Sequence, residues 1–195
     1  MPDQLDLFRT STAALPEGFR YASEVLAADA EDALITEIRK LPLREFEFRG
    51  YTGRRRTVSF GWTYDFASEQ LRAAEPIPAF LIPLREIAAA FAWVSVDTLQ
   101  QVLVSEYGPG AGIGWHRDKP VFDQVIGISL LSACRLRLRR RRGDGTWERS
   151  SVRLEPRSAY LLGGPARAEW EHSIPEVDAP RYSITFRSLR SAAGG

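Results

Sequence analysis

The chain has 195 residues, a hydrophobic fraction of 44% and a formal net charge of +1, values that predict a single globular domain with a sizeable core. Its one cysteine, Cys134, excludes an intramolecular disulfide and fits a reducing compartment, so we expect a cytoplasmic protein. The sequence has no apolar run long enough to cross a bilayer and no signal-peptide pattern, and we expect a monomer that does not contact membranes.

The N-terminal half is predicted to contain helices and a recognition segment. Residues 1–16 are expected to form a flexible arm. Residues 29–41 have apolar positions at helical spacing, with Asp29 as a possible cap and a proline directly after them. A strand is predicted at 44–48, where apolar and polar residues alternate.

Residues 50–66 combine turn residues, three consecutive arginines and several aromatics. A second helix is predicted at about 80–92, where Pro83 is tolerable only in the first turn. From residue 99 onward the pattern changes to strands. These are predicted at 99–107, at 125–138 with a break near Ser132, at 147–154 after a turn at 143–145, at 158–162 and at 181–189.

A glycine-rich loop leads directly into the motif His116-x-Asp118, and the only other histidine is His172. Residues i and i+2 of a strand point to the same face, so the first two side chains can reach one ion. Two imidazoles and one carboxylate form the ligand set of a non-haem iron site. A short His-x-Asp pattern is more often a solvated surface pair, and the neighbouring features decide between these interpretations.

The last predicted strand supplies such a feature, because Arg181 and Arg187 are six residues apart and share one face. Two inward-facing arginines are costly unless an anion meets them. A buried dicarboxylate would satisfy both, since a guanidinium binds a carboxylate through two hydrogen bonds.

With His116-x-Asp118, His172 and the arginine pair, the chain resembles the AlkB-type iron(II)- and 2-oxoglutarate-dependent dioxygenases. The resemblance implies an α+β fold: a double-stranded β-helix (jelly-roll) core with N-terminal helices packed on one face. It implies one AlkB-like domain at 17–190, with helices and a recognition lid at 17–98, the jelly-roll at 99–190 and a tail at 191–195.

The resemblance also assigns roles to individual residues. His116, Asp118 and His172 match the iron ligands. Arg181 matches the arginine that pairs with the distal carboxylate of 2-oxoglutarate, and Arg187 the one near the end chelated to iron. Further cosubstrate contacts fall on Tyr107 and on Ser105, which stands where the family usually has asparagine.

The implied reaction is oxidative demethylation of N-alkylated bases in single-stranded DNA or RNA, a DNA-repair activity that releases succinate, CO2 and formaldehyde. A protein or small-molecule substrate of the same enzyme class is the alternative, and a cupin-like metal-binding module without turnover is a third possibility. The residues expected to contact the substrate are Tyr51, Arg54, Arg56, Trp62, Tyr64, Trp115, Arg139 and Arg141.

Arginines are concentrated in residues 135–157, and their alternation with leucines predicts a strand with one basic face. Because the arginine fork fits phosphate oxygens, this face is one candidate for backbone contacts. An edge-protecting, solvated strand explains the same pattern equally well.

Overall fold

The computed structural model describes residues 14–48, 51–65 and 68–190, although the side chains of residues 46–53 are not described. The predicted arm lies outside the described residues except for positions 14–16, and the predicted tail at 191–195 lies entirely outside them. None of the described helices is long and apolar enough to cross a membrane.

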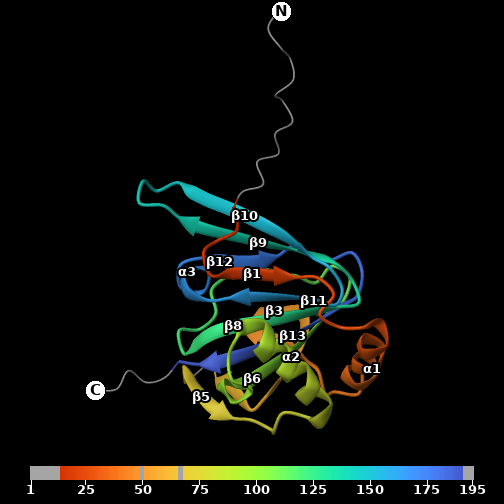
Figure 1. The fold of residues 1–195 in the computed structure, drawn as a ribbon. Coiled ribbons are helices and arrows are strands. Elements are labelled where there is room, and N and C mark those ends of the chain that lie inside the picture. Colours follow the sequence, from red (N-terminus) through yellow and green to blue (C-terminus); the bar gives the residue numbers. More distant parts are fainter. Residues whose placement is uncertain (1–13, 49–50, 66–67, 191–195) are drawn as a thin grey trace, which may run out of the picture.

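Two antiparallel sheets face each other, and helices cover the outer side of the larger sheet (Figure 1). The larger sheet has the order β1 (Phe19–Ala22), β11 (Ser158–Leu162), β8 (Phe122–Leu130), β13 (Arg181–Leu189), β6 (Leu99–Tyr107), β3 (Tyr51–Phe60) and β2 (Arg44–Phe48). The smaller sheet has the order β10 (Trp147–Leu154), β9 (Cys134–Arg141), β12 (Glu171–Ile174) and β7 (Ile113–His116).

The remaining elements lie outside these two sheets. The α-helices are α1 (Ala28–Ile38), α2 (Ile82–Ala92) and α3 (Gly164–Ala168). Short 3-10 turns occupy Ala79–Leu81 and Val96–Thr98, and β4 (Trp62–Asp65) pairs with β5 (Gln70–Ala73) as a separate ribbon.

Strand alternation gives the larger sheet two different faces. Even-numbered residues of β13, such as Ile184 and Phe186, pack with Leu84 and Ala88 of α2 in one core. Odd-numbered residues of the same strand face the smaller sheet, where a second core includes Leu136 of β9. The period of two that defines a strand therefore separates the helix-covered core from the space between the sheets.

The architecture confirms the predicted α+β fold with a jelly-roll core and helices on one face. The helices predicted at 29–41 and 80–92 are present as α1 and α2, shifted slightly at their ends. The prediction that Asp29 caps α1 is wrong, because the N-cap position is Ala27. The Asp29 carboxylate instead accepts the Ala30 N–H inside the first turn at 2.9 Å, where a negative charge complements the helix dipole.

The C-terminal strands follow the predicted pattern. The strand predicted at 125–138 is two strands, β8 and β9, separated near Ser132 as expected, and β9 and β10 form the predicted hairpin. The sequence did not predict β1 or β5, and it placed the two histidines on strands without giving bounds for β7 or β12; each of these strands has four residues. Such short strands carry too little alternation to be recognised without their partners.

No strand was predicted in the segment 50–66, but the structure has β3 and β4 there. β3 is built into the larger sheet beside β6, and only the β4–β5 ribbon stands outside the two sheets. Gly61 makes the break between β3 and β4, with a φ of +74° and a hypothetical Cβ 2.1 Å from the Gln100 carbonyl oxygen. Glycine alone fits a positive φ at so close an approach of two backbones.

Candidate active site

Both histidines and an aspartate meet at the edge of the smaller sheet. β12 pairs with β7 so that His172 lies directly opposite His116, and the two ring centroids are 4.2 Å apart. Asp118 lies just beyond the end of β7, with its Oδ2 3.6 Å from His172 Nε2. The fold therefore brings together the three residues that the sequence assigned as metal ligands.

Burial and hydrogen bonding prepare both imidazoles for a cation. His116 Nδ1 lies 2.9 Å from the Gly114 carbonyl oxygen, which assigns the proton to that nitrogen and leaves Nε2 as the electron-pair donor. Burial lowers the pKa of His116, and burial together with the neighbouring His116 lowers the pKa of His172 to about 3. Both rings are thus neutral near pH 7, the form that binds metals.

The Asp118 carboxylate remains ionised although it is buried. Burial on its own raises the pKa of this carboxyl, but Arg187 and the two imidazoles outweigh it and hold the pKa well below its usual range. Arg187 Nε and Nη2 each lie 2.9 Å from Asp118 Oδ1, and Arg187 Nη1 donates to Gln101 Oε1 at 2.8 Å. The carboxylate thus joins an arginine on one side to the histidines on the other.

Two neutral imidazoles and one carboxylate fit Fe(II) chemically. Among the residues that the structure describes, no three His, Cys, Asp or Glu side chains form a preformed metal cage. Arg187 contacts Oδ1 of Asp118, whereas Oδ2 is the oxygen that lies toward His172. Oδ2 is therefore the oxygen that a cation bound by the histidines would meet.

Arg181, the other inward-facing arginine of β13, is 0% exposed. Its Nε donates to Ser129 Oγ at 3.2 Å, and its guanidinium carbon lies 5.0 Å from the centroid of the Tyr107 ring. Both terminal nitrogens are buried without a hydrogen-bond partner within the described structure. A buried guanidinium in this state is costly, and a carboxylate that accepts both nitrogens would relieve the cost.

A narrow cavity lies between the two sheets, beside the histidines. Ser105 and Tyr107 line it from β6, Arg187 lines it from β13, and His116 and His172 line it from the smaller sheet. Its volume is about 30 Å³, room for a water molecule or two rather than for 2-oxoglutarate. Side chains must therefore move when a dicarboxylate enters.

Sequence reasoning missed Arg55, although it selected the neighbouring Arg54 and Arg56. Arg55 is buried and lines the cavity, whereas Arg56 pairs with Glu106. Strand alternation could have identified it, because Phe60 belongs to the helix-side core and odd-numbered residues of β3 then face the cavity. No strand was predicted at 50–66, so this alternation was not recognised.

Arg167 of α3 was also missed, and it positions the loop after Asp118. Its Nη2 donates to the carbonyl oxygens of Lys119 and, at 2.9 Å, of Phe122. No signal near this arginine in the sequence points to the role, because its partners lie more than forty positions away. Gln101, Ser129 and Tyr160 were missed for the same reason.

Some of the residues predicted to contact the substrate lie beside the cavity. The Tyr64 ring centroid is 5.0 Å from Lys119 Nζ, and Arg54 Nη1 is 2.7 Å from where a Cβ on Gly110 would stand. β3 thus approaches the glycine-rich loop through Arg54, and β4 approaches the residue after Asp118 through Tyr64. Trp62 is half-buried in β4, and the side chain of Tyr51 lies outside the described residues.

Other residues predicted to contact the substrate lie on the opposite side of the smaller sheet. Trp115 was expected to form a wall of the cavity, but it is not among the lining residues. Its ring packs against the guanidinium groups of Arg137 and Arg139, at 5.0 and 4.3 Å. Trp115 precedes His116 on the strand, so its side chain takes the other face. Arg141 shares the strand parity of Arg139 and lies on this outer side as well.

A model of the 2OG-Fe(II) oxygenase superfamily matches residues 18–187, a span that includes His116, Asp118, His172, Arg181 and Arg187. The chain belongs to this superfamily. As a 2OG-Fe(II) oxygenase, it is an enzyme that uses Fe(II) and 2-oxoglutarate. The neutral histidines with Asp118 and the unpaired nitrogens of Arg181 fit these two groups.

Curated relatives of this oxygenase include proteins from a plant and a virus. It is 26% identical over 162 residues to an alkylated DNA repair protein ALKBH8 homolog of Arabidopsis thaliana, covering 70% of this chain and 47% of that protein. It is 32% identical over 102 residues to uncharacterized protein L905 of Acanthamoeba polyphaga mimivirus, covering 46% of this chain and 48% of that protein. The chain thus spans about half the length of these relatives.

Solved structures support the fold assignment. The structure of OsALKBH1 has a TM-score of 0.66 at 19% identity and covers 90% of this chain and 98% of its own. A prolyl-4-hydroxylase from Pseudomonas putida has a TM-score of 0.58 at 18% identity, with coverages of 90% and 94%. Both share the jelly-roll fold with this oxygenase.

Proposed function

We propose that this oxygenase removes N-alkyl groups from bases in single-stranded nucleic acid. The observation that carries the proposal is the position of Arg55, a cation that reaches into the cavity beside the candidate iron ligands. Arg54 and the Tyr64–Lys119 pair extend this cationic and aromatic character outside the cavity. A base presented with its phosphates meets both kinds of contact here. Similarity to proteins named as AlkB homologues supports the same substrate class.

Fe(II) and 2-oxoglutarate, when bound, supply the oxidation of the alkyl carbon by O2 coupled to decarboxylation of the cosubstrate. In the balance for an N-methyl group, one oxygen atom enters succinate and the other enters formaldehyde. CO2 leaves the cosubstrate, and the base nitrogen ends with a hydrogen in place of the methyl group.

The protein contributes binding and orientation. His116, Asp118 and His172 would hold the cation, and Arg181 would bind the distal carboxylate of the cosubstrate through its two unpaired nitrogens. Asp118 would offer Oδ2 to the cation, and Arg187 would exchange its contact with Oδ1 for one with the other end of the cosubstrate. This exchange would also enlarge the narrow cavity, because Arg187 is one of its walls.

The remaining walls keep water away from the reacting groups. Leu103, Ile113 and Leu136 line the cavity between its polar ends. A dry, preorganised site confines oxidation to the positioned substrate carbon and limits side reactions.

The test is turnover with a single-stranded oligonucleotide that carries 1-methyladenine. The protein is loaded with Fe(II) anaerobically, and 2-oxoglutarate and oxygen are then added. Loss of the methyl mass and release of succinate are followed together, with Asp118→Ala as the inactive control. Methyl loss in step with succinate release supports the proposal.

Two other results would count against this proposed function or against the site assignment. Succinate release without methyl loss, on DNA and RNA alike, rejects nucleic-acid demethylation and favours a protein or small-molecule substrate. Full activity in the Asp118→Ala variant rejects the assignment of the metal site instead.

A further inference from the structure

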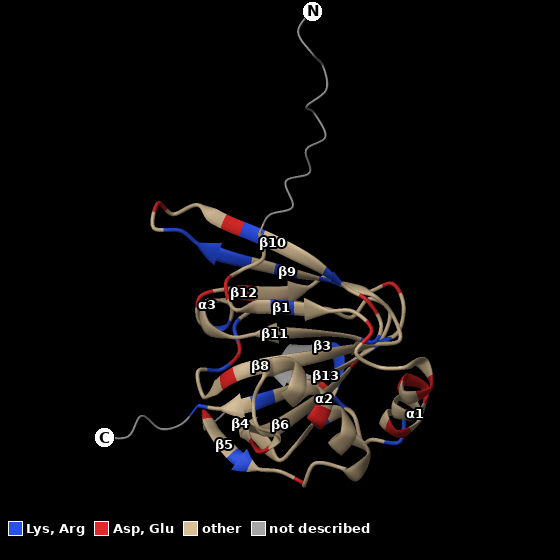
Figure 2. Cartoon of the chain, in the orientation of Figure 1, with Lys and Arg blue, Asp and Glu red and all other residues tan. Residues whose placement is uncertain are grey.

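The side of the smaller sheet turned away from the cavity is strongly basic, and the reaction described above does not use it. We call this side the outer face. It is formed by Arg135, Arg137, Arg139 and Arg141 of β9, Arg149, Arg153 and Trp147 of β10, and Trp115 of β7. Leu136 and Leu138, which alternate with these arginines, are fully buried on the inner side. The arginines of both hairpin strands are blue in Figure 2.

Acidic side chains neutralise only part of this charge. Arg139 pairs with Glu171 at 2.7 Å, and Arg153 pairs with Glu155 at 2.5 Å. Arg135, Arg141 and Arg149 are exposed and have no ion pair to any acidic residue that the structure describes. The outer face therefore keeps a net positive charge.

The register places like charges directly opposite each other. Arg149 of β10 lies across from Arg139 of β9, and Arg153 lies across from Arg135. Like charges directly opposite each other destabilise a sheet. One arginine of each pair has a carboxylate partner, Glu171 for Arg139 and Glu155 for Arg153, which leaves Arg149 and Arg135 without one among the described residues. Protection of a sheet edge accounts for Arg149 and Arg153 of the edge strand β10, but not for the arginines of β9, which is an interior strand flanked by β10 and β12.

Two tryptophan rings lie against an arginine of the outer face. The Arg139 guanidinium carbon lies 4.3 Å from the ring centroids of both Trp115 and Trp147. The stack crosses the sheet from β7 to β10, a width of roughly 14 Å at the usual strand spacing. Arginine forks beside aromatic rings are the combination that binds phosphates and stacks bases of a flexible single strand.

The outer face and the cavity lie on the two sides of the same edge strand. β7 is the last strand of the smaller sheet, and its consecutive residues Trp115 and His116 lie on opposite sides of it. A chain that leaves the outer face at Trp115 therefore passes round the edge of the sheet to the candidate iron ligands.

We propose that the outer face is a binding track for the phosphate backbone of single-stranded nucleic acid, which holds the strand whose modified base enters the cavity. The proposal extends the proposed function and rests on nucleic acid as the substrate. It assigns to this face affinity and salt dependence, and leaves chemistry to the cavity on the other side of the sheet.

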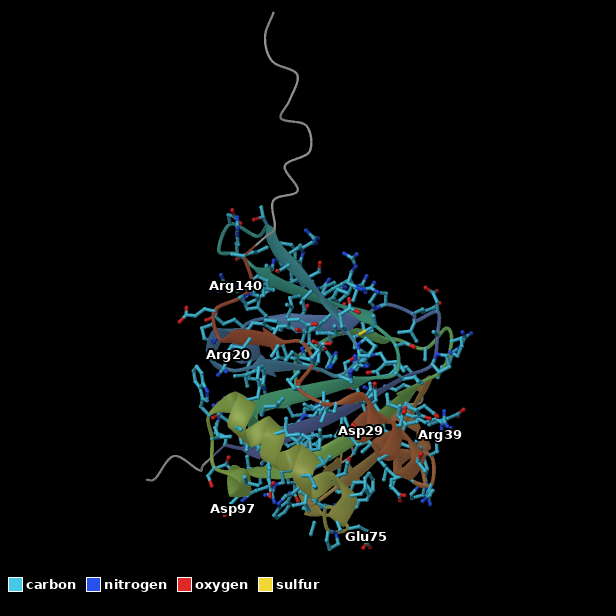
Figure 3. All side chains as sticks on the ribbon, turned by 45° about the vertical axis from the view of Figure 1, so that its right-hand side comes forward. Arg20, Asp29, Arg39, Glu75, Asp97 and Arg140 are labelled. Atoms are coloured by element: carbon cyan, nitrogen blue, oxygen red, sulfur yellow. The ribbon has the colours of Figure 1, made fainter. Side chains whose placement is uncertain are left out.

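The test compares two double variants that remove the same charge. Arg135→Gln with Arg149→Gln alters the outer face, and Arg39→Gln with Lys40→Gln alters exposed residues at the end of α1. Figure 3 shows Arg39 far from Arg140 of the hairpin, so the control lies on a separate surface. Binding of a labelled, unmodified oligonucleotide is measured by fluorescence anisotropy over a range of salt concentrations, with no metal or 2-oxoglutarate added.

The outer-face variant should bind on the order of tenfold more weakly at low salt, with a salt slope reduced by about 1.4, since each single-strand phosphate contact contributes roughly 0.7. The control should match the unmodified protein. Equal slopes for both variants would overturn the proposal. Equally tight binding of polyglutamate or phosphatidylserine vesicles, lost in the same variant, would overturn the assignment to nucleic acid.

Turnover separates this proposal from the proposed function. With a long methylated oligonucleotide the outer-face variant should have a higher KM and an unchanged kcat, and with a methylated trinucleotide both should be unchanged. Salt-dependent binding through the outer face without any methyl loss would uphold the track and reject demethylation. Methyl loss with the same KM in both variants would uphold demethylation and reject the track.

Discussion

At the scale of single residues, the two arginines of β13 differ in the hydrogen-bond partners of their guanidinium groups. Arg187 already has a carboxylate and an amide as partners, whereas the terminal nitrogens of Arg181 are buried without any within the described structure. Arg181 is thus maintained at a cost to stability that only an incoming anion offsets.

Replacing this residue should have opposite effects on stability and on cosubstrate use. Arg181→Met should raise the 2-oxoglutarate requirement on the order of 10- to 100-fold, since hydrogen bonds to charged groups contribute about 1.5–3 kcal/mol. The cosubstrate-free protein should unfold at the same or a higher temperature, because an unpaired buried charge is gone. Thermal unfolding with and without 2-oxoglutarate measures both effects. A large loss of stability in the cosubstrate-free variant would contradict this account.

Arg55 and Arg56 provide a matched pair on opposite faces of β3. Arg55→Gln should lower kcat/KM for the methylated oligonucleotide roughly tenfold, while uncoupled 2-oxoglutarate consumption continues. Arg56→Gln should change little, because its partly exposed pair with Glu106 contributes about 0–1 kcal/mol. Steady-state kinetics on both variants tests the assignment, which fails if Arg56→Gln is the more damaging change.

Cys134 is buried, as expected for a small apolar residue of β9. Burial raises the pKa of its thiol above the ordinary value. At pH 8 the thiolate fraction is then smaller than for a free cysteine, and the reaction with iodoacetamide should be slow in the folded protein. Denaturant should restore the rate of a free thiol. Mass spectrometry of timed aliquots measures this difference, and rapid alkylation of the folded protein would contradict it.

At the scale of elements, β8 and β11 illustrate how a glycine shapes the site. Tyr160 of β11 pairs with Gly127 of β8, and a Cβ on this glycine would lie 2.2 Å from the tyrosine ring. The glycine therefore lets the aromatic ring lie flat across the strand and form one wall of the cavity.

A methyl group at this position should displace the ring. Gly127→Ala should destabilise the fold by about 1–3 kcal/mol, the usual cost of overpacking, and should weaken 2-oxoglutarate binding as the ring moves into the cavity. Gly143→Ala in the β9–β10 turn is the control, because nothing lies within 4 Å of its hypothetical Cβ. Chemical denaturation and cosubstrate titration compare the two, and equal stabilities would disprove the packing argument.

At the scale of the whole molecule, the larger sheet belongs to both cores. Its strands contribute one face to the helix-side core and the other to the core between the sheets. Neither core can lose its packing while the other stays intact. We expect one cooperative unfolding transition, with coincident near-UV and far-UV circular dichroism.

Ligand addition should shift that transition. Fe(II) with 2-oxoglutarate under anaerobic conditions should stabilise the protein by about 2.7 kcal/mol at a hundredfold excess over Kd. The Asp118→Ala variant should lose the part of this stabilisation that depends on the metal. Two separate transitions, or a shift of equal size in this variant, would contradict the single-core account or the metal-site assignment.

The sequence alone determined the features that local spacing controls. Alternation and turn residues predicted the C-terminal strands, and the residue types of His116-x-Asp118, His172, Arg181 and Arg187 predicted the donor set and the anion site. The strand predictions succeed because a strand's period of two does not depend on distant neighbours. The donor set and the anion site stay predictions that rest on the chemistry of the side chains.

Only the tertiary structure decided which strands become neighbours, and so which side chains share a space. The β12–β7 register places the distant histidine opposite the motif, and the β3–β6 pairing turns Arg55 inward. The β7–β12–β9 arrangement sends Trp115 to the outer face instead of the cavity. Pairings between residues far apart in the chain follow from the packing of the whole domain, because four-residue strands are too short to specify their own partners.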